Sequence, residues 1–459
     1  MVPGHRDFVQ AGYSARKACS HVHACGKVRE RLHDVVVFHG NVDQNAWTTP
    51  CVCEVRGAPT HLNGTAPVTL KDAPLGDDYT ELEVRRMRCV CSKCGHCHDQ
   101  ESPFKSGSHQ ITLRAEHYIA ALPSCGYIIK EVADITGISK NIVKEIDKER
   151  LEHYCVTTDK DGRKFLKKPA RLARVLGIDE FKPHQGHQYA TIIVDMDTKW
   201  ILWIAIGKGK DVVYDFIRHV GLEWMSRAEA VSSGMNAGSI SAFKEMCPHI
   251  EAVHDHFHLV KNLHDGVTSP VRPDLAREYE ARGDHESARQ IKRGKHLLME
   301  GRGTMRQRDS EAGTLKGRDS ELFNAKPKEA RGNREETYDS LLTLNFLLFM
   351  IDWVKDAPED ACRSKTRAEM RSRIENIILH CEATRNKHFE WYARLLRNHI
   401  EGIVTFADYH VTNGVVEGIN QRTKTIRRKS YGLSDDEYFL LKVVDSSRKG
   451  DWMDQSHKI

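Results

Sequence analysis

Long hydrophobic runs are missing from this sequence. The longest apolar stretch, Leu341–Val354, is interrupted by Asn345 and Asp352 and is too short to span a bilayer, so it predicts a buried helix. The first residues contain no apolar segment of the kind that directs export. Internal repeats and low-complexity linkers are lacking as well. We therefore expect a cytoplasmic protein that makes no contact with a membrane.

A strong excess of one charge is also missing, since the net charge is only +5 over 459 residues. With 40% hydrophobic and 29% charged residues, the composition is typical of a globular protein with about two to four structural units. The basic residues are unevenly distributed, however. One cluster lies in 289–308, and a second consists of Arg422, Lys424, Arg427, Arg428 and Lys429. Each is either a solvated helix face or a phosphate-binding surface, and DNA-binding signals nearby would favour the second.

The cysteines are concentrated near the N-terminus. Eight of the 13 precede residue 100: Cys19, Cys25, Cys51, Cys53, Cys89, Cys91, Cys94 and Cys97. In a cytoplasmic chain such clustering favours metal ligation over disulfides. Residues 1–105 also contain only short strand-like runs and few residues for an apolar core, so a small metal-stabilised module is expected there.

Residues 106–160 have a helical pattern that indicates a helix-turn-helix. Ala133, Gly137 and Val143 are spaced so that a small residue lets two helices approach, a glycine forms the turn and an apolar residue packs the second helix back. Ser139 is a suitable N-cap for this second helix. An ordinary helical hairpin would use the same glycine turn without binding DNA. If the segment does bind DNA, its second helix would lie in a major groove with Lys140, Asn141 and Lys144 reaching bases or phosphates.

The pattern then changes to three strands, a helix, a strand, a helix and a strand within residues 170–262. This order predicts an α/β domain with a mixed sheet. Residues 263–404 are almost wholly helical in pattern, strand signals do not resume after the sheet, and residues 405–445 are helical as well. The chain is therefore expected to be multidomain, with an all-α block between the sheet and the last helix.

Three segments carry residues suited to catalysis. Asp179 ends the first strand of the core, where a carboxylate either caps a turn or serves a functional site at the sheet edge. The His254–His258 segment could supply metal ligands or form a structural cluster, and strand alternation would place Asp255 and Phe257 on one face. On a helix, a carboxylate, an amide and cations would share one stripe, namely Glu417, Asn420, Lys424, Arg427 and Arg428. Such a stripe suits a metal ligand, Glu417, beside a DNA-binding track formed by Asn420, Lys424, Arg427 and Arg428.

Taken in order, these segments resemble the signatures of the ISL-three group of bacterial insertion-sequence transposases. They read Gly-Ile-Asp179-Glu-Phe, Asp255-His-Phe-His258-Leu-Val-Lys and Thr412-Asn-Gly-Val-Val-Glu417-Gly-Ile-Asn420. The resemblance, which spans about residues 50–445, implies an RNase H-like core of the DDE type, formed by residues 170–262 and 405–445 and interrupted by a large all-α insertion at 263–404. It also implies Mg²⁺ (or Mn²⁺) held by Asp179 and Glu417, and transfer of DNA strands by two-metal chemistry.

The second carboxylate of that set is missing. Similar proteins have an acid within a Val-Ser-x-Asp-Met pattern, and here Gly234 stands in its place within Val231–Met235. Since a glycine offers no ligand atom, the expected cost in rate is several orders of magnitude. Two explanations are open: a decayed or repurposed transposase that still binds DNA, or a substitute carboxylate such as Asp255.

The resemblance further implies a Zn²⁺ module in which two cysteine knuckles meet at one tetrahedral ion. Its ligands would be a subset of Cys51, Cys53, Cys89, Cys91, Cys94 and Cys97. A second ion at Cys19, His21, His23 and Cys25 is an alternative use of the earlier segment.

The resemblance also implies double-stranded DNA as partner, both terminal inverted repeats and target, with a homo-oligomer assembled on it and a nucleoid-associated location. A catalytically inactive DNA-binding regulator descended from a transposase is the competing hypothesis. An RNase H-like nuclease outside transposition is disfavoured, because such an enzyme needs no sequence-reading helix-turn-helix.

Overall fold

A computed structural model describes residues 19–30, 33–42, 60–99, 105–158, 160–162, 164–183, 188–233, 237–317, 319, 321–322, 326–412, 414–430 and 435–448. The chain divides into two compact units, and each is treated by itself below. The first comprises residues 1–167 with 423–459, and the second comprises residues 168–422. The predicted core segment 405–445 is therefore divided between the two units.

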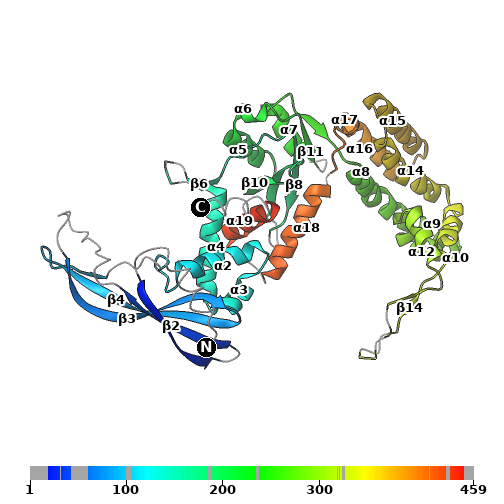
Figure 1. The fold of residues 1–459 in the computed structure, drawn as a ribbon. Helices are drawn as coiled ribbons and strands as arrows, with labels where there is room; N and C mark the ends of the chain where they lie inside the picture. Colours follow the sequence, from blue (N-terminus) through cyan, green and yellow to red (C-terminus); the bar gives the residue numbers. More distant parts are fainter. Residues whose placement is uncertain are drawn as a thin grey trace. The chain divides into compact units, whose positions relative to one another are not determined.

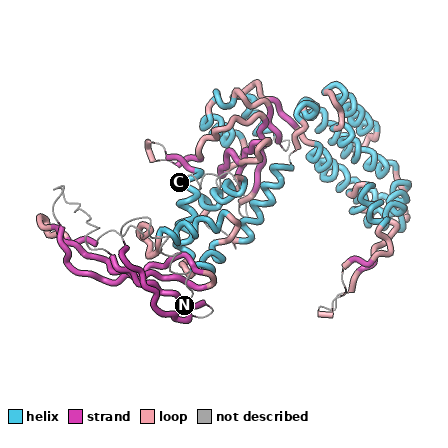
Figure 2. The backbone as a smooth tube through the Cα atoms, in the orientation of Figure 1, coloured by secondary structure: helices cyan, strands magenta, loops and turns pink. Residues whose placement is uncertain are grey.

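The first unit begins with a five-stranded sheet, seen as the long magenta strands of Figure 2. Its strands are β1 (Cys19–Glu30), β2 (His33–Val42), β3 (Thr60–Leu75), β4 (Asp78–Cys91) and β5 (Cys97–Asp99). They are ordered β1-β2-β4-β3, with β5 paired to β4. The strands are longer than the short runs expected from sequence. Their buried apolar cluster is nevertheless small: Phe38, Leu70, Leu82 and Val84.

Three helices follow, α2 (Leu113–Ser124), α3 (Ile129–Thr136) and α4 (Lys140–Cys155). The expected turn is confirmed: Gly137 adopts φ +66°, and the Ser139 side chain caps α4 by accepting a hydrogen bond from the Ile142 amide. Ala133 and Val143 are both buried in the cluster that joins the helices. A short hairpin, β6 (Val156–Thr158) and β7 (Lys164–Leu166), comes next.

The last helix of the chain, α19 (Asp436–Ser447), packs on α4 through a buried ionic network. Asp147 is fully buried and accepts hydrogen bonds from Arg150, Tyr438 and Lys442 at 2.8, 2.6 and 3.0 Å. Arg150 also pairs with Asp445 at 3.2 Å. Burial opposes ionisation of Asp147, but Lys442 and Arg150 outweigh it, so the pKa of this carboxyl is lowered. The stabilisation that ionised Asp147 gives is therefore fully present above the unfolded-state pKa of this carboxyl. It is lost as pH falls through the lower pKa of the folded state.

The second unit contains the expected mixed sheet. Its strands are β8 (Val175–Phe181), β9 (Ala190–Asp195), β10 (Ile201–Ile206), β11 (Ala230–Ser233) and β12 (Glu251–Val253), in the order β10-β9-β8-β11-β12. The first three are antiparallel neighbours, whereas β11 runs parallel to β8 and β12. The predicted order of strands and helices is confirmed.

Strand alternation gives β8 two different faces. Leu176 and Ile178 belong to the apolar core formed with α5 (Lys210–Val220), α6 (Leu222–Met225) and α7 (Ala237–Met246). Gly177 lies on the other face, against α18 (Gly414–Lys429), which Figure 1 draws in orange beside β8. The sheet is thus covered on both faces.

The segment between the sheet and α18 is helical, as expected. It comprises α8 (His256–Leu263), a π-helical turn (His264–Thr268), α9 (Ser269–Ala281), α10 (His285–Arg293), α11 (Lys295–Met299), α12 (Arg302–Ser310), α13 (Arg334–Thr343), α14 (Phe346–Cys362), α15 (Arg367–Ala383), α16 (Lys387–Val404) and α17 (Phe406–Tyr409). The expectation that strands do not resume is wrong in one place. Two short strands, β13 (Leu315–Lys316) and β14 (Lys328–Glu329), form a hairpin between α12 and α13.

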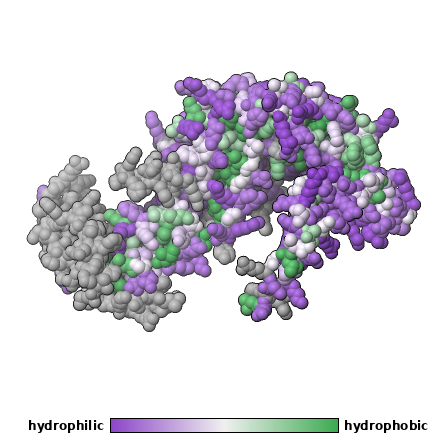
Figure 3. Space-filling view, turned by 45° about the vertical axis from the view of Figure 1, so that its right-hand side comes forward, coloured by the Kyte–Doolittle hydropathy of each residue, from purple (hydrophilic) through white to green (hydrophobic). Residues whose placement is uncertain are grey.

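None of the described helices is long and apolar enough to cross a membrane. Leu341–Val354 is divided between α13 and α14, and its buried residues include Leu342, Ile351 and Val354. On the face shown in Figure 3, hydrophilic side chains cover most of the described surface and hydrophobic ones gather only in small groups.

The network on α4 yields a stability prediction. Asp147→Ala should lower the local free energy of opening of α4 and α19 by about 3 kcal/mol, because Arg150 and Lys442 lose a buried carboxylate. Amide hydrogen exchange measures this opening. Glu149→Ala, on the exposed face of the same helix, should change it by less than about 0.5 kcal/mol. Equal effects of the two substitutions would show that the network does not stabilise the unit.

Candidate active site

Asp179 lies near the end of β8, on the face that α18 covers. Two residues earlier, Gly177 makes the close approach of this helix possible. A Cβ at Gly177 would lie 2.8 Å from Val416 Cγ2 and 2.4 Å from the Met196 sulfur, and both distances are too short for real contacts. Only glycine therefore allows α18 to lie this close to the strand.

Because α18 lies so close, its Asn420 reaches Asp179. The Asn420 Nδ2 group donates a hydrogen bond to Asp179 Oδ2 at 2.7 Å. Asn420 is only 9% exposed, and its Oδ1 atom is buried without a hydrogen-bond partner. An unpaired buried amide oxygen beside a carboxylate is costly unless a donor or a cation occupies the space next to it.

Burial raises the pKa of the Asp179 carboxyl above its ordinary value. The Glu180 backbone amide, His258, Asn420 and Lys261 act in the opposite direction without cancelling the effect of burial. A positive charge next to Asp179 would favour its ionised form.

The segment after β12 differs from its expected geometry. Strand alternation was predicted through His258, but β12 ends at Val253, and α8 begins at His256. Asp255 is the N-cap of α8, because its Oδ1 accepts a hydrogen bond from the Phe257 amide at 3.3 Å. A capping aspartate starts a helix, and this local preference overrides the alternating pattern. The predicted division of these residues between two strand faces is therefore wrong.

His258, in the first turn of α8, has an imidazole whose pKa is affected by the nearby acidic residues. Burial lowers the pKa of its imidazole, while the negative charges of Asp179, Asp255 and Glu417 raise it without compensating fully. All three candidate carboxylates are therefore close enough to His258 to affect the pKa of its imidazole.

His254 has a structural role instead. It is 2% exposed, and its imidazole packs edge-on to His399 with ring centroids 5.2 Å apart. The His254 amide donates to the Gly402 carbonyl at 2.8 Å, and a Cβ at Gly402 would collide with the ring. Burial lowers the pKa of His254 to about 4, so it joins α16 to the sheet as a neutral residue.

The predicted polar stripe of α18 is divided between two environments. Asn420 belongs to the buried face, whereas Glu417, Lys424 and Arg428 are exposed. Arg427 lies over the ring of Phe439 at 5.6 Å. Neither Lys424 nor Arg428 forms an ion pair with an acidic residue of the described segments.

Gly234, the residue expected to weaken the site, lies outside the described residues. The last residue of β11, Ser233, pairs with Ile178, the residue before Asp179. The Ser233 hydroxyl is buried without a hydrogen-bond partner. The described end of β11 thus lies beside β8 close to Asp179.

The oxygen donors at this site have the chemistry that Mg²⁺ prefers: the carboxylates of Asp179 and Glu417 and the unpartnered Oδ1 of Asn420. Across the described segments, however, no three His, Cys, Asp or Glu side chains are grouped so that they could hold one metal ion. The described residues therefore fit part of a hard-cation site, with an amide oxygen beside the acids.

The cysteine-rich segment makes a tight turn at Cys91–Cys94, although its described Cys and His side chains are not grouped so that three of them could hold one metal ion. The Gly95 amide donates to the Cys91 carbonyl at 3.0 Å, and the His96 amide donates to the Cys94 sulfur at 3.4 Å. Gly95 adopts φ +70°, which allows this tight turn. Cys89 is buried in β4, and Cys97 begins β5. Cys51 and Cys53 lie outside the described residues, as do the side chains of Cys19, His21, His23 and Cys25.

On α4, the three residues expected to contact DNA differ in their surroundings. Lys140 and Asn141 are exposed in the first turn. Lys144 instead pairs with Asp435 at 2.9 Å and lies over the ring of Tyr438. A DNA phosphate would compete with Asp435 for this lysine, so Lys140 and Asn141 are the more accessible pair.

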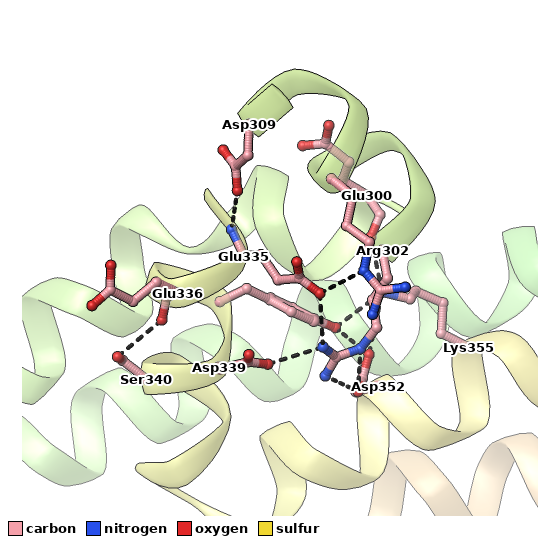
Figure 4. Close-up of polar contacts among 11 residues, drawn as sticks. Glu300, Arg302, Asp309, Glu335, Glu336, Asp339, Ser340, Asp352 and Lys355 are labelled. Carbon is pink, nitrogen blue, oxygen red and sulfur yellow. Dashed lines mark hydrogen bonds and ion pairs between the residues drawn. The ribbon is translucent and has the colours of Figure 1, made fainter. Parts of the chain in front are cut away.

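The basic cluster at 289–308 is largely neutralised by acids, as Figure 4 shows for Arg302. Arg302 pairs with Asp339 at 2.9 Å and with Asp352 at 2.8 Å. Four more basic residues of the cluster form ion pairs. These pairs are Arg289 with Glu286, Lys292 with Glu280, Arg306 with Glu335, and Arg308 with Glu300. The cluster thus stabilises the helical segment and is a poor candidate for phosphate binding. The cluster on α18 is the better one.

A mixed five-stranded sheet, helices on both faces and a large helical segment make this a multidomain α/β protein, and this architecture fits the transposase class. The model of the ISL3-type DDE transposase family, described as "Transposase", matches residues 176–443. The chain belongs to this family, which confirms the resemblance of its motifs.

Curated relatives agree with this assignment. The transposase of insertion sequence element IS1001 from Bordetella parapertussis is 25% identical over 395 residues, which cover 85% of this chain and 87% of the relative. The transposase of IS1557 from Mycobacterium tuberculosis is 23% identical over 276 residues, 59% of each chain.

The proximity of His258 to the acids is open to a direct test. Since the Asp179 charge raises the pKa of His258, Asp179→Asn should lower it further. Histidine ring NMR, assigned with His258→Gln, measures the shift. Asp211→Asn, at the exposed start of α5, is the matched control. A His258 pKa that does not respond to Asp179→Asn would place the two side chains too far apart for a common site.

Zinc content tests the knuckle. The native protein should carry about one Zn²⁺ per chain, and Cys91→Ser with Cys94→Ser should remove it because this pair has the ligand spacing of a zinc knuckle. Cys125→Ser, an exposed cysteine outside the cluster, should retain the metal. Native mass spectrometry that finds no zinc in the unsubstituted protein would contradict the module.

Proposed function

We propose that this protein binds the ends of an insertion sequence and carries out metal-dependent cleavage and transfer of DNA strands, with impaired turnover. The contact between Asn420 and Asp179 carries this proposal. It brings the helix that bears Glu417 against the strand that bears Asp179, in a chain of the transposase family. The strand order, with β8 central, antiparallel to β9 and parallel to β11, supports an RNase H-like core.

Each residue at the site has a distinct role in this proposal. Asp179, Glu417 and the Asn420 amide oxygen would hold Mg²⁺ or Mn²⁺, which supplies charge stabilisation to the attacking and leaving oxygens. Asn420 also orients the Asp179 carboxylate through its amide N–H group. Lys424 and Arg428 extend along the exposed side of the same helix and would bind the DNA backbone.

Gly234 accounts for the impairment. A glycine leaves the two-metal site one carboxylate short, and repulsion between cations and between phosphates grows accordingly. Asp255 is an unfavourable substitute, because it is 1% exposed and caps α8. Turning it toward a metal would leave the Phe257 amide without its acceptor. We therefore favour a weakened site over a repaired one.

The first unit would supply DNA recognition. The helix-turn-helix geometry of α3 and α4 supports insertion of α4 into a major groove, led by Lys140 and Asn141. The Zn²⁺ module would stabilise the small N-terminal sheet. We further propose that the protein acts on terminal inverted repeats and target DNA as a homo-oligomer, associated with the nucleoid.

A DNA-binding regulator derived from a transposase is the second candidate, and Gly234 is the observation that favours it. Both candidates bind DNA, so only strand cleavage distinguishes them. The regulator would retain Asp179 as a structural partner of Asn420 and would cut no strand.

Cleavage of a duplex carrying the terminal repeat, in Mg²⁺ or Mn²⁺, tests the proposal. We expect slow cleavage by the native protein and none by Asp179→Ala or Glu417→Ala. Gly234→Asp should raise the rate by at least about 10²-fold, because it restores a metal ligand. Gly234→Asn, which has nearly the same size and no charge, is the control. If neither the native protein nor Gly234→Asp cleaves DNA while both bind it, the regulator is the correct assignment.

A further inference from the structure

Three neighbouring strands of the second unit end at the same edge of the sheet. Phe181 at the end of β8 and Ile206 at the end of β10 both pair with Ala190 at the start of β9. Beyond these pairs, the Gly207 amide donates to the Tyr189 carbonyl at 2.7 Å. The residues just past the strand ends, among them Lys182 and Lys208, are therefore held close to Tyr189.

Two lysines share the aromatic ring at this edge. The Nζ atoms of Lys182 and Lys208 lie 5.2 and 4.6 Å from the centroid of the Tyr189 ring. The attraction of a cation to an aromatic face holds both ammonium groups near the ring, so they are within about 10 Å of each other. Two like charges at this separation repel, and an anion between them would relieve the repulsion.

No acidic residue of the described segments forms an ion pair with either lysine, and both are exposed. The contrast with Lys210 is informative, because this lysine, two residues after Lys208, pairs with Glu245. Lys182 and Lys208 instead combine exposure, a shared ring and positive charge. We call them, with Tyr189, the Tyr189 cluster.

The position of the cluster suggests its ligand. Lys182 follows Asp179 by three residues and lies just past the end of β8, a separation of about 10 Å along an extended chain. A DNA strand with one phosphate at Asp179 would place a nearby phosphate within reach of a flexible lysine. Lysines on an aromatic ring neutralise phosphates but do not read bases, so the contact would be independent of sequence.

We propose that the Tyr189 cluster binds the phosphodiester backbone of the host DNA that flanks the element, just outside the scissile bond. This inference rests on the proposed function for the position of that bond. Host DNA varies from one insertion to another, and a contact without sequence preference suits it. The cluster would thus complement α4, which is proposed to read the terminal repeat.

The salt dependence of DNA binding tests the cluster, because each phosphate contact contributes about one unit to the slope of log K against log salt. Lys182→Gln with Lys208→Gln should reduce this slope by about 1.5 to 2 on a duplex that carries the terminal repeat and flanking DNA. On a duplex that stops at the element end, the slope should not change. Circular dichroism checks that the variants are folded.

Lys199→Gln with Lys244→Gln is the matched control, since it removes the same charge from exposed lysines of the same unit. Tyr189→Phe keeps the ring and should bind flanking DNA as the native protein does. Tyr189→Leu should weaken that binding several-fold, because the two ammonium groups lose their common anchor.

If the lysine pair and its control change the slope equally, or if the effect persists on the duplex without flanking DNA, the proposal is wrong. The two proposals can fail separately. A native protein that binds flanking DNA through the cluster but cleaves no strand would contradict the proposed chemistry and leave the cluster intact. A native protein that does not bind the flanked duplex would contradict both.

Discussion

The arrangement of the candidate site depends on the close contact between β8 and α18 at Gly177. A side chain at this position would overlap with Val416 and Met196, so the helix would have to move away from the strand. With glycine, α18 lies near enough for Asn420 to hydrogen-bond Asp179. The position of Glu417, one turn earlier on the same helix, follows from this contact. The lack of a side chain at Gly177 thus allows Asp179 and Asn420 to meet, although they are more than two hundred positions apart in the sequence.

Burial and charge compete at the site. Removal of Asp179 from water raises its pKa, and removal of His258 from water lowers the pKa of the imidazole. Both effects favour uncharged groups, although the two residues interact electrostatically. A divalent cation would reverse this balance by favouring the carboxylate. The unpartnered Oδ1 of Asn420 would gain a partner at the same time. The buried network around Asp147 differs, because there the protein supplies its own cations and the carboxyl pKa is lowered.

Phosphate-binding capacity could not be read from basic residues alone. The 289–308 cluster and the α18 cluster are both rich in basic residues, but α13 and α14 supply Glu335, Asp339 and Asp352 to the first. These three acids lie on other helices than their basic partners, so no local pattern reveals the pairing. The Tyr189 cluster was missed for the same reason. Its three residues come from three strand ends, and no sequence motif connects them.

The sequence by itself determined the family, the order of strands and helices in the core and the turn at Gly137, because these depend on ordered motifs, hydrophobic periodicity and the conformational freedom of glycine. It also identified Asp179 and Glu417 as candidate ligands. Only the tertiary structure decided that Asp255 caps a helix, that Asn420 is buried against Asp179 and that Lys144 pairs with Asp435. Each of these outcomes depends on which residue from elsewhere in the chain occupies the neighbouring space, and local sequence does not contain that information.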